Sequence, residues 1–290
     1  MSDPFGAEYA VPVPGGTLHV AGAGADPRGA RAVVVALHGV ASNHVAWRAV
    51  ARSLLGQEGI AVLAPDLRGR GRSAELPVHD AFSQHAEDVV AVLDAFGIDR
   101  ALLAGHSMGA YVAAGVAAER ASELVLVDGA LPLPLEPGAD PDEVLEQVLG
   151  PALARLRMTF DSPEGYVAFW RSHPAFQDWN EDIEAFARYD FDGERSAVSE
   201  EAVRRDMTAL LVDERTRTAA ARSRVPTRLL RAPRGLMNDD RVMIPDDALE
   251  AFLRQRPDVR AELVPGVNHY TIVMGAGAPR VSAAIAAALA

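Results

Sequence analysis

The sequence predicts an α/β protein in which a parallel sheet is covered by helices on both faces and interrupted by a helical insertion. Three observations lead to this class: short apolar runs alternate with segments of helical spacing, the alternation stops after Asp128, and it resumes at Thr227. Alternating strands and helices form parallel sheets because each connecting helix packs back onto the sheet. With 290 residues, 49% of them hydrophobic, the chain is long enough for one such core.

The individual elements follow from local patterns. A hairpin of 7–13 and 17–21, turning at Gly15-Gly16, is expected before the alternation begins. Uninterrupted apolar runs are typical of strands buried on both faces. The predicted strands after the hairpin are 31–37, 60–64, 101–104, 124–127, 227–232 and 260–264. The predicted helices of the alternating part are 45–55, 79–96, 108–120, 246–254 and 279–289.

The stretch between the two alternating parts has helical spacing and no clear strand. It begins with a proline-rich segment, 131–137, which is typical of a linker. Most of the aromatic residues lie in this stretch: Phe160, Tyr166, Phe169, Trp170, Phe176, Trp179, Phe186, Tyr189 and Phe191. Such an insertion can roof a cleft with apolar rings.

Composition excludes several kinds of chemistry. The formal net charge is −12, so phosphate backbones are repelled, and we expect neither nucleic acid nor membrane insertion. The chain has no cysteine and no lysine, which excludes thiol and Schiff-base catalysis. No histidine–carboxylate group has metal-ligand spacing, so no metal or cofactor is expected. Without a signal-peptide pattern or a long apolar run, a cytoplasmic location is expected.

The strongest chemical signal is a serine between two glycines, in Gly105-His106-Ser107-Met108-Gly109. This segment fits the G-x-S-x-G nucleophile elbow, a strained turn between a strand and a helix that lifts the serine hydroxyl clear of the sheet. A strand-like run precedes it and a helix-like run follows it. We therefore predict that Ser107 is the nucleophile and that the Met108 amide, at the helix N-terminus, stabilises an oxyanion.

Two further segments complete a hydrolytic site. His38, Gly39 and Val40 follow the strand 31–37, where this kind of fold provides a second oxyanion amide, here that of Val40. His38 is expected to brace the loop through hydrogen bonds and is also a candidate substrate contact. His269 follows the last predicted strand, and we predict that it is the base that takes the serine proton.

The acid partner of the base stays open between three aspartates. Asn238 occupies the expected position after the strand 227–232, and Asp239 and Asp240 follow it one and two residues late. Asp128, at the end of the strand 124–127, is the other place from which a carboxylate can reach the base. We favour Asp239 over Asp128, and place Asp240 third.

Together these segments resemble the α/β-hydrolase superfamily along nearly the whole chain. The resemblance rests on His38-Gly39, on 65–73 (Pro-Asp-Leu-Arg-Gly-Arg-Gly-Arg-Ser), on the elbow and on Gly266-Val267-Asn268-His269-Tyr270. It implies a mostly parallel eight-stranded sheet with a helical cap after the sixth strand. The core would then comprise 1–131 and 225–290, and the cap 132–224. It also implies a serine–histidine–acid triad. The serine at the nucleophile position argues against epoxide hydrolase and dehalogenase chemistry, which use aspartate there.

The resemblance leaves the substrate open. The leading hypothesis is hydrolysis of an ester or lactone of a small hydrophobic molecule, with a thioester or amide as variants, through an acyl-enzyme. Alternatives are a carbon–carbon bond hydrolase or lyase with the same triad, and a capped ligand receptor without catalysis. Trp47, Trp170 and Trp179 are the candidate ligand contacts among the aromatics. The sequence does not determine the oligomeric state, and a homodimer stays open.

Overall fold

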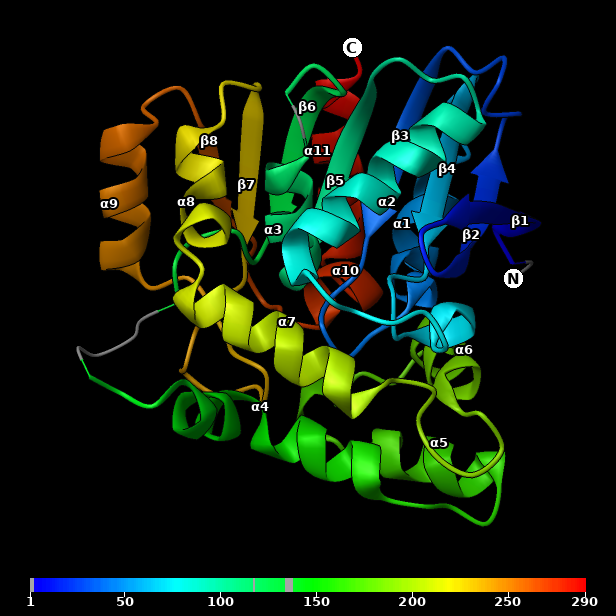
Figure 1. The fold of residues 1–290 in the computed structure, drawn as a ribbon, viewed down its shortest axis with the longest axis vertical. Coiled ribbons are helices and arrows are strands. Elements are labelled where there is room, and N and C mark those ends of the chain that lie inside the picture. Colours follow the sequence, from blue (N-terminus) through cyan, green and yellow to red (C-terminus); the bar gives the residue numbers. More distant parts are fainter. Residues whose placement is uncertain (1–2, 117, 134–137) are drawn as a thin grey trace.

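The computed structural model describes residues 3–116, 118–133 and 138–290 and shows a central eight-stranded sheet with helices on both faces (Figure 1). The order across the sheet is β1-β2-β4-β3-β5-β6-β7-β8. The strands are β1 (Phe5–Val13), β2 (Gly16–Gly24), β3 (Ala32–Leu37), β4 (Ile60–Pro65), β5 (Ala101–His106), β6 (Ala121–Val127), β7 (Thr227–Arg231) and β8 (Arg260–Leu263). This confirms the predicted fold class.

Only β2 runs opposite to the other strands of the described sheet. β1 and β2 form an antiparallel hairpin, β2 also runs antiparallel to β4, and every pairing from β4 to β8 is parallel. The parallel strands need crossover connections, which the helices provide. Because β3, β5 and β6 are neighbours and run in the same direction, the residues that follow them meet at one edge of the sheet.

Each central strand is apolar on both faces because helices cover both. Val33, Val35 and Leu37 of β3 pack into one core layer, while Val34 and Ala36 pack into the other. The first layer is completed by α2 (Ala81–Ala95), α3 (Met108–Gly115) and α9 (Asp246–Gln255). The second is completed by α1 (Arg48–Leu54), α10 (Thr271–Met274) and α11 (Ala278–Ala288).

Among the described residues between β6 and β7 there are five α-helices. Four of them, which we call the cap helices, lie together beyond one end of the sheet (Figure 1). They are α4 (Pro141–Arg157), α5 (Pro163–Arg171), α6 (Glu181–Asp190) and α7 (Glu200–Val212). All four begin at side chains that accept hydrogen bonds from the free amides of the first turn, namely Asp140, Ser162, Asn180 and Ser199.

The fifth helix, α8 (Glu214–Arg222), packs against α3 rather than joining the cap helices. The division into a core of 1–131 and 225–290 and a cap of 132–224 stays a prediction, and its linker residues 134–137 lie outside the described residues. The predicted helix 108–120 is shorter in the structure, since α3 ends at Gly115. The predicted helix 45–55 begins as a 3₁₀ turn, His44–Trp47, before α1.

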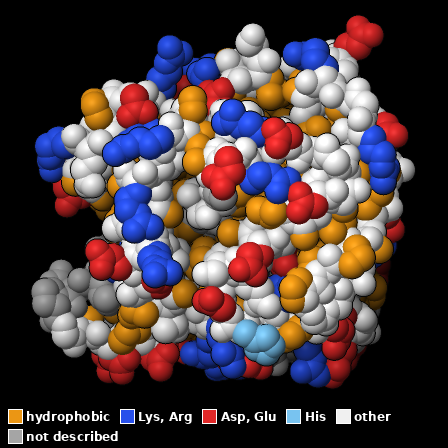
Figure 2. Space-filling view, turned by 45° about the horizontal axis from the view of Figure 1, so that its top comes forward, with side chains coloured by type: hydrophobic (Ala, Val, Ile, Leu, Met, Phe, Trp, Pro, Cys, Tyr) orange, Lys and Arg blue, Asp and Glu red, His pale blue; other side chains and the backbone are white. Residues whose placement is uncertain are grey.

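The surface carries charges of both signs. Acidic and basic side chains both occur across the face shown in Figure 2, with apolar side chains between them. Within the described part of the chain, no helix combines the length and the apolar composition that crossing a bilayer requires.

Candidate active site

Ser107 lies at the turn between β5 and α3, in backbone geometry that is unusual for a residue with a side chain. Its φ is 54° and its ψ is −122°. The flanking glycines make the turn possible: a Cβ on Gly105 would lie 2.2 Å from the Gly109 oxygen, and one on Gly109 would lie 2.1 Å from the Leu37 oxygen. The close approach of backbones on both sides holds Ser107 in its strained conformation at the edge of the sheet.

Two backbone amides lie beside this serine. Met108 begins α3, where N–H groups have no partner inside the helix. The loop after β3 passes close to Ser107, since a Cβ on Gly39 would lie 3.3 Å from the Ser107 Cβ. Among the described residues, no acceptor is found for the amides of Val40 or Met108. Both residues line one cavity with Ser107, so both amides are available to an oxygen atom bound there.

His269 is held by a buried carboxylate, and that carboxylate belongs to Asp128. The His269 Nδ1 lies 2.7 Å from Asp128 Oδ2, and the Ala232 amide donates to Asp128 Oδ1 at 3.0 Å. A carboxylate beside Nδ1 favours the tautomer with its proton on Nδ1, which leaves Nε2 free to accept a proton. His269 lines the same cavity as Ser107. Within the described chain their side chains share no hydrogen bond, an arrangement that often tightens only when a substrate binds.

Asp239, favoured from the sequence, is wrong as the partner of His269. Its carboxylate accepts instead from Arg241, at 2.7 and 2.8 Å. The Asp240 side chain is 97% exposed and faces Arg234. Asn238 forms a turn with a φ of 57°, and both of its oxygens accept from Arg234. Among the described residues, the loop after β7 therefore provides His269 with no carboxylate, and the end of β6 provides Asp128.

His106 is a residue that sequence reasoning missed. Its Nε2 donates to the His269 backbone oxygen at 2.7 Å, and the centroids of the His106 and His269 rings lie 4.7 Å apart. Burial, together with the nearby His269, holds the pKa of His106 well below its usual range. A neutral His106 can fix the backbone of His269 without placing a second positive charge next to it. The only signal for it in the sequence was its place inside the elbow motif.

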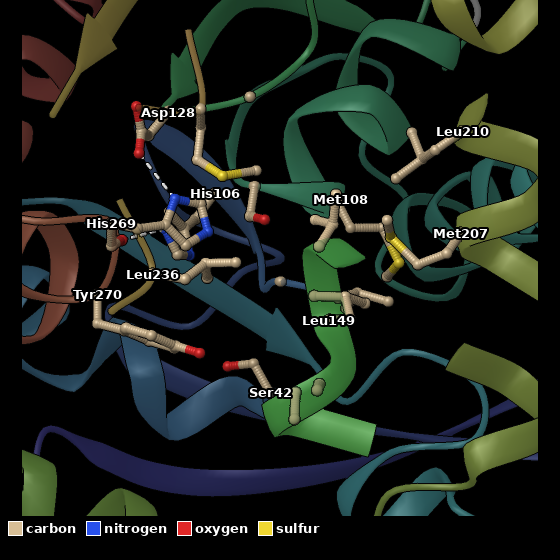
Figure 3. A pocket seen from close by; sticks show the side chains of 18 of the residues that line it. Ser42, His106, Met108, Asp128, Leu149, Met207, Leu210, Leu236, His269 and Tyr270 are labelled. Atoms are coloured by element: carbon tan, nitrogen blue, oxygen red, sulfur yellow. Dashed lines mark hydrogen bonds and ion pairs between the residues drawn. The ribbon is translucent and has the colours of Figure 1, made fainter. Parts of the chain in front are cut away.

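The cavity above Ser107 is largely apolar and contains about 750 Å³ of empty space including its mouth. Figure 3 shows Met207 and Leu210 beside Met108 on one side, with His269 and Tyr270 opposite. The cap helices contribute the apolar roof: Val148, Leu149, Ala152, Met207 and Leu210. The Tyr270 hydroxyl points toward Ser42, which adds a polar pair to this lining (Figure 3).

A wider outer cavity continues from the first, sharing Leu149, Leu236 and Tyr270 with it. Of the predicted ligand contacts, Trp170 lines this outer cavity. Trp47 is buried in the layer beneath α1, and Trp179 packs on Phe176, so neither lines either cavity.

His38 lines neither cavity either, and it braces its loop. Its Nδ1 donates to the Gly39 oxygen at 2.8 Å, and its Nε2 accepts from the Leu67 amide at 2.9 Å. Burial lowers the pKa of His38 to about 3, so the ring is neutral and can both donate and accept. The candidate role of His38 as a substrate contact is therefore wrong, because both ring nitrogens are used inside the protein.

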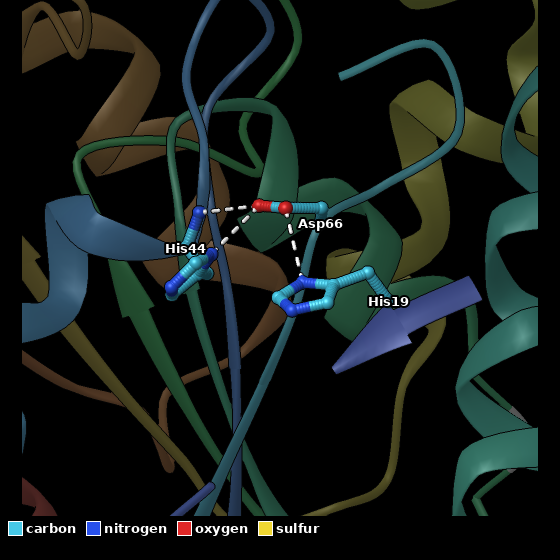
Figure 4. Close-up of side chains that lie close together, drawn as sticks. All are labelled: His19, His44 and Asp66. Atoms are coloured by element: carbon cyan, nitrogen blue, oxygen red, sulfur yellow. Dashed lines mark hydrogen bonds and ion pairs between the residues drawn. The ribbon is translucent and has the colours of Figure 1, made fainter. Parts of the chain in front are cut away.

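A second polar cluster lies away from the elbow and joins His19, His44 and Asp66 (Figure 4). Residue spacing could not reveal it, since β2, β4 and the turn before α1 bring the three together. Asp66 accepts from both imidazoles, from the amides of His44 and Arg72, and from the Tyr189 hydroxyl. Burial alone would raise the pKa of Asp66, but His44 and the histidine hydrogen bonds hold it well below its usual range. Five donors saturate the carboxylate, so the cluster fits a structural hydrogen-bond centre better than a metal site.

A sequence model of the alpha/beta hydrolase family matches residues 34–284, and the chain belongs to this family. Epoxide hydrolase B of Mycobacterium tuberculosis is 41% identical over 83 residues, 28% of this chain and 23% of that protein. A non-heme chloroperoxidase of Burkholderia pyrrocinia is 28% identical over 238 residues, 76% of this chain and 79% of the relative. The crystal structure of an E-2-(acetamidomethylene)succinate hydrolase superposes with a TM-score of 0.77 at 20% identity, covering 97% and 98% of the two chains.

The match to the epoxide hydrolase spans about a quarter of that protein's length. The structural neighbour shares the fold with this chain at low sequence identity. Family membership supports a hydrolytic enzyme.

Proposed function

We propose that the protein is a serine hydrolase that cleaves an ester or lactone of a small hydrophobic molecule through an acyl-enzyme. One observation carries this proposal: His269 pairs with the buried Asp128 at 2.7 Å and lines the same apolar cavity as Ser107, which lies on a strained turn. A nucleophile, a base and an oriented acid in one cavity fit acyl transfer.

In the first half of the reaction, the Ser107 Oγ attacks the substrate carbonyl carbon while its proton passes to His269 Nε2. Asp128 stabilises the imidazolium that forms, because its carboxylate lies against Nδ1. The carbonyl oxygen becomes an oxyanion, which accepts from the Val40 and Met108 amides. When the carbon–oxygen bond to the leaving group breaks, His269 returns its proton to that oxygen.

In the second half, a water molecule attacks the acyl-enzyme carbonyl and gives a proton to His269. The collapse of this second tetrahedral intermediate breaks the bond to Ser107 and releases the carboxylic acid. His269 then reprotonates the serine oxygen. Each amide at the oxyanion site is worth about 2.7–4 kcal/mol of transition-state stabilisation in enzymes of this type.

The lining of the cavity favours an apolar acyl group. Leu149, Met207 and Leu210 surround the space beside Met108. The chain has no lysine, and among the described residues no arginine lines this inner cavity, so no cationic side chain attracts an anion there. Ser107 stands where an epoxide hydrolase would need a carboxylate nucleophile, so we do not extend the activity of that relative to this chain.

The test is a panel of p-nitrophenyl esters, lactones and thioesters, with Ser107→Ala as the matched control. The proposal expects the wild type to hydrolyse at least one apolar ester and Ser107→Ala to lose this activity by more than 10⁴-fold, to near the rate of the oxyanion site alone. Equal rates for the two proteins would reject it. Cleavage of a 1,3-diketone with all esters untouched would instead select the carbon–carbon bond hydrolase.

A further inference from the structure

The loop after β3 is held by three buried side chains acting on consecutive carbonyl groups. His38 donates to the Gly39 oxygen at 2.8 Å, Arg70 Nε donates to the Val40 oxygen at 2.8 Å, and Arg155 Nη2 donates to the Ala41 oxygen at 3.3 Å. The first of these carbonyls belongs to the peptide unit that carries the Val40 amide. The orientation of that amide therefore depends on how firmly the whole loop is held.

Arg70 also reaches the other side of the oxyanion site. Its Nη2 lies 3.7 Å from the Met108 sulfur, and its Nη1 donates to the Arg68 oxygen at 2.7 Å. The side chain is fully buried, so each donor must find a partner inside the protein. Arg70 thus contacts both residues whose amides face the oxyanion in the proposed function.

The charge of Arg70 is balanced from the cap. Asp206 of α7 lies 2.5 Å from Arg70 Nη1 and also pairs with His85 of α2. Burial would raise the pKa of Asp206, but Arg70 and His85 outweigh it and keep that pKa low. A second arginine has the same arrangement. Arg155 of α4 pairs with Asp190 of α6 at 2.6 Å and also donates to the loop. Both arginines that grip the loop are thereby anchored by aspartates of the cap helices.

We propose that Arg70, held by Asp206, is a positioning residue that sets the Val40 amide for catalysis and couples the cap helices to the oxyanion site. This inference rests on the proposed function, since it assigns a role in stabilising the same oxyanion. Asp206 and Arg70 touch no reacting atom. Their effect passes through the loop, and a small displacement of an oxyanion donor is costly, since about 1 Å of misplacement can lower a rate 10²-fold.

The test compares Asp206→Asn with a matched cap-to-core variant, Asp182→Asn. Asp182 of α6 pairs with Arg48 and Arg52 of α1 at 2.6–2.9 Å, and it does not contact the 39–42 loop. Both variants remove a charge from a cap–core ion pair, so both are expected to lower the thermal unfolding midpoint. Only Asp206→Asn releases Arg70.

Four quantities are measured for each full-length protein: kcat and KM for an ester that the wild type hydrolyses, the second-order rate of labelling by a fluorophosphonate, and the unfolding midpoint. We expect Asp206→Asn to lower kcat and the labelling rate about 10- to 100-fold, with KM changed less than threefold. Asp182→Asn is expected to stay within threefold of the wild type in all three kinetic values.

If Asp206→Asn does not fold, Arg70→Lys takes its place, because lysine keeps the charge beside Asp206 but has one nitrogen where Arg70 uses three. A folded Asp206→Asn or Arg70→Lys with wild-type kcat and labelling rate overturns the inference alone. An equal loss in Asp182→Asn overturns it as well, because a general loosening of the cap would then explain the effect. A wild type that neither hydrolyses esters nor labels overturns the proposed function and with it this role.

Discussion

The floor and the roof of the inner cavity are built in different ways. The floor consists of residues at strand ends whose geometry is fixed by the backbone: the Val40 loop, the Ser107 turn, Asp128 and His269. The roof consists of apolar side chains on the cap helices, such as Leu149 and Met207, which line the cavity. The residues of the proposed chemistry are therefore placed by the backbone, whereas the shape of the cavity depends on side chains that can be substituted.

The largest effect is expected at the floor, where Asp128→Asn leaves His269 with an amide in place of a carboxylate. The wrong tautomer and the loss of charge should lower kcat about 10⁴-fold with little change in KM. The control is Asp239→Asn, since Asp239 pairs with Arg241 and not with the base. Steady-state kinetics on one ester decide between them, and a larger loss in Asp239→Asn would contradict the assignment of the acid.

At the roof, Leu149→Ala should change selectivity more than the chemistry. Removing this side chain extends the inner cavity, so the ratio of kcat/KM for octanoyl to butyryl esters is expected to rise about 10- to 30-fold. Leu145→Ala on the same helix is the control, because Leu145 is fully buried but lines neither cavity. Both variants lose stability, by about 2–5 kcal/mol. A wild-type chain-length profile for Leu149→Ala would show that the roof does not shape the substrate space.

A smaller effect is expected on the pH dependence of stability, and it differs between a histidine beneath the floor and one in the outer cavity. His38, which braces the Val40 loop from below, has a pKa of about 3 in the folded protein and about 6.5 in the unfolded chain. The unfolded chain therefore binds more protons between these values, and stability decreases as the pH is lowered. The contribution of His38 is a loss of about 1.4 kcal/mol between pH 7.5 and 5.5, a tenfold change in the unfolding equilibrium.

Urea unfolding at pH 7.5 and 5.5 measures this effect, and His38→Asn should reduce the pH dependence by that amount. His173 of the outer cavity is the comparison. Its pKa is lowered to about 4, chiefly by burial and then by Arg155. Both folded pKa values lie below 5.5, so the difference between the two shifts does not matter in this pH range. Because the His173 ring is partly accessible to solvent, charging it costs less in the folded protein, and His173→Asn should reduce the pH dependence less. An unchanged pH dependence in His38→Asn would mean that the ring is not held neutral.

The same contrast explains which features could be predicted from the sequence. The strands and their parallel arrangement follow from apolar runs and their spacing, and the elbow is a local signature around Ser107. His269 could be named because it follows the last strand. The acid could not, since both Asp128 and Asp239 follow strands, and choosing between them requires the conformation of each loop. In the structure the Asn238 turn directs the residues after β7 toward Arg234 and Arg241 instead.

The contacts of the cap helices could not be predicted from the sequence for a related reason. Each depends on residues far apart in the sequence, as in the pairing of Arg70 with Asp206 or of Arg155 with the Ala41 oxygen. Aromatic composition drew attention to Trp47 and Trp179, yet both are used for packing, and the roof beside Ser107 is made of leucine and methionine. Composition indicates that rings are present but does not indicate which way they face.

The central claim is that Ser107 is an activated nucleophile, and covalent labelling tests it most directly. The wild-type protein is treated with a fluorophosphonate, digested and analysed by peptide mass spectrometry, with Ser107→Ala and His269→Ala treated alongside. The account predicts a single adduct on the peptide that contains Ser107, much slower labelling in His269→Ala and none in Ser107→Ala. Two results would contradict it: an adduct on another residue, or a wild-type protein that hydrolyses esters although Ser107 does not react with the fluorophosphonate.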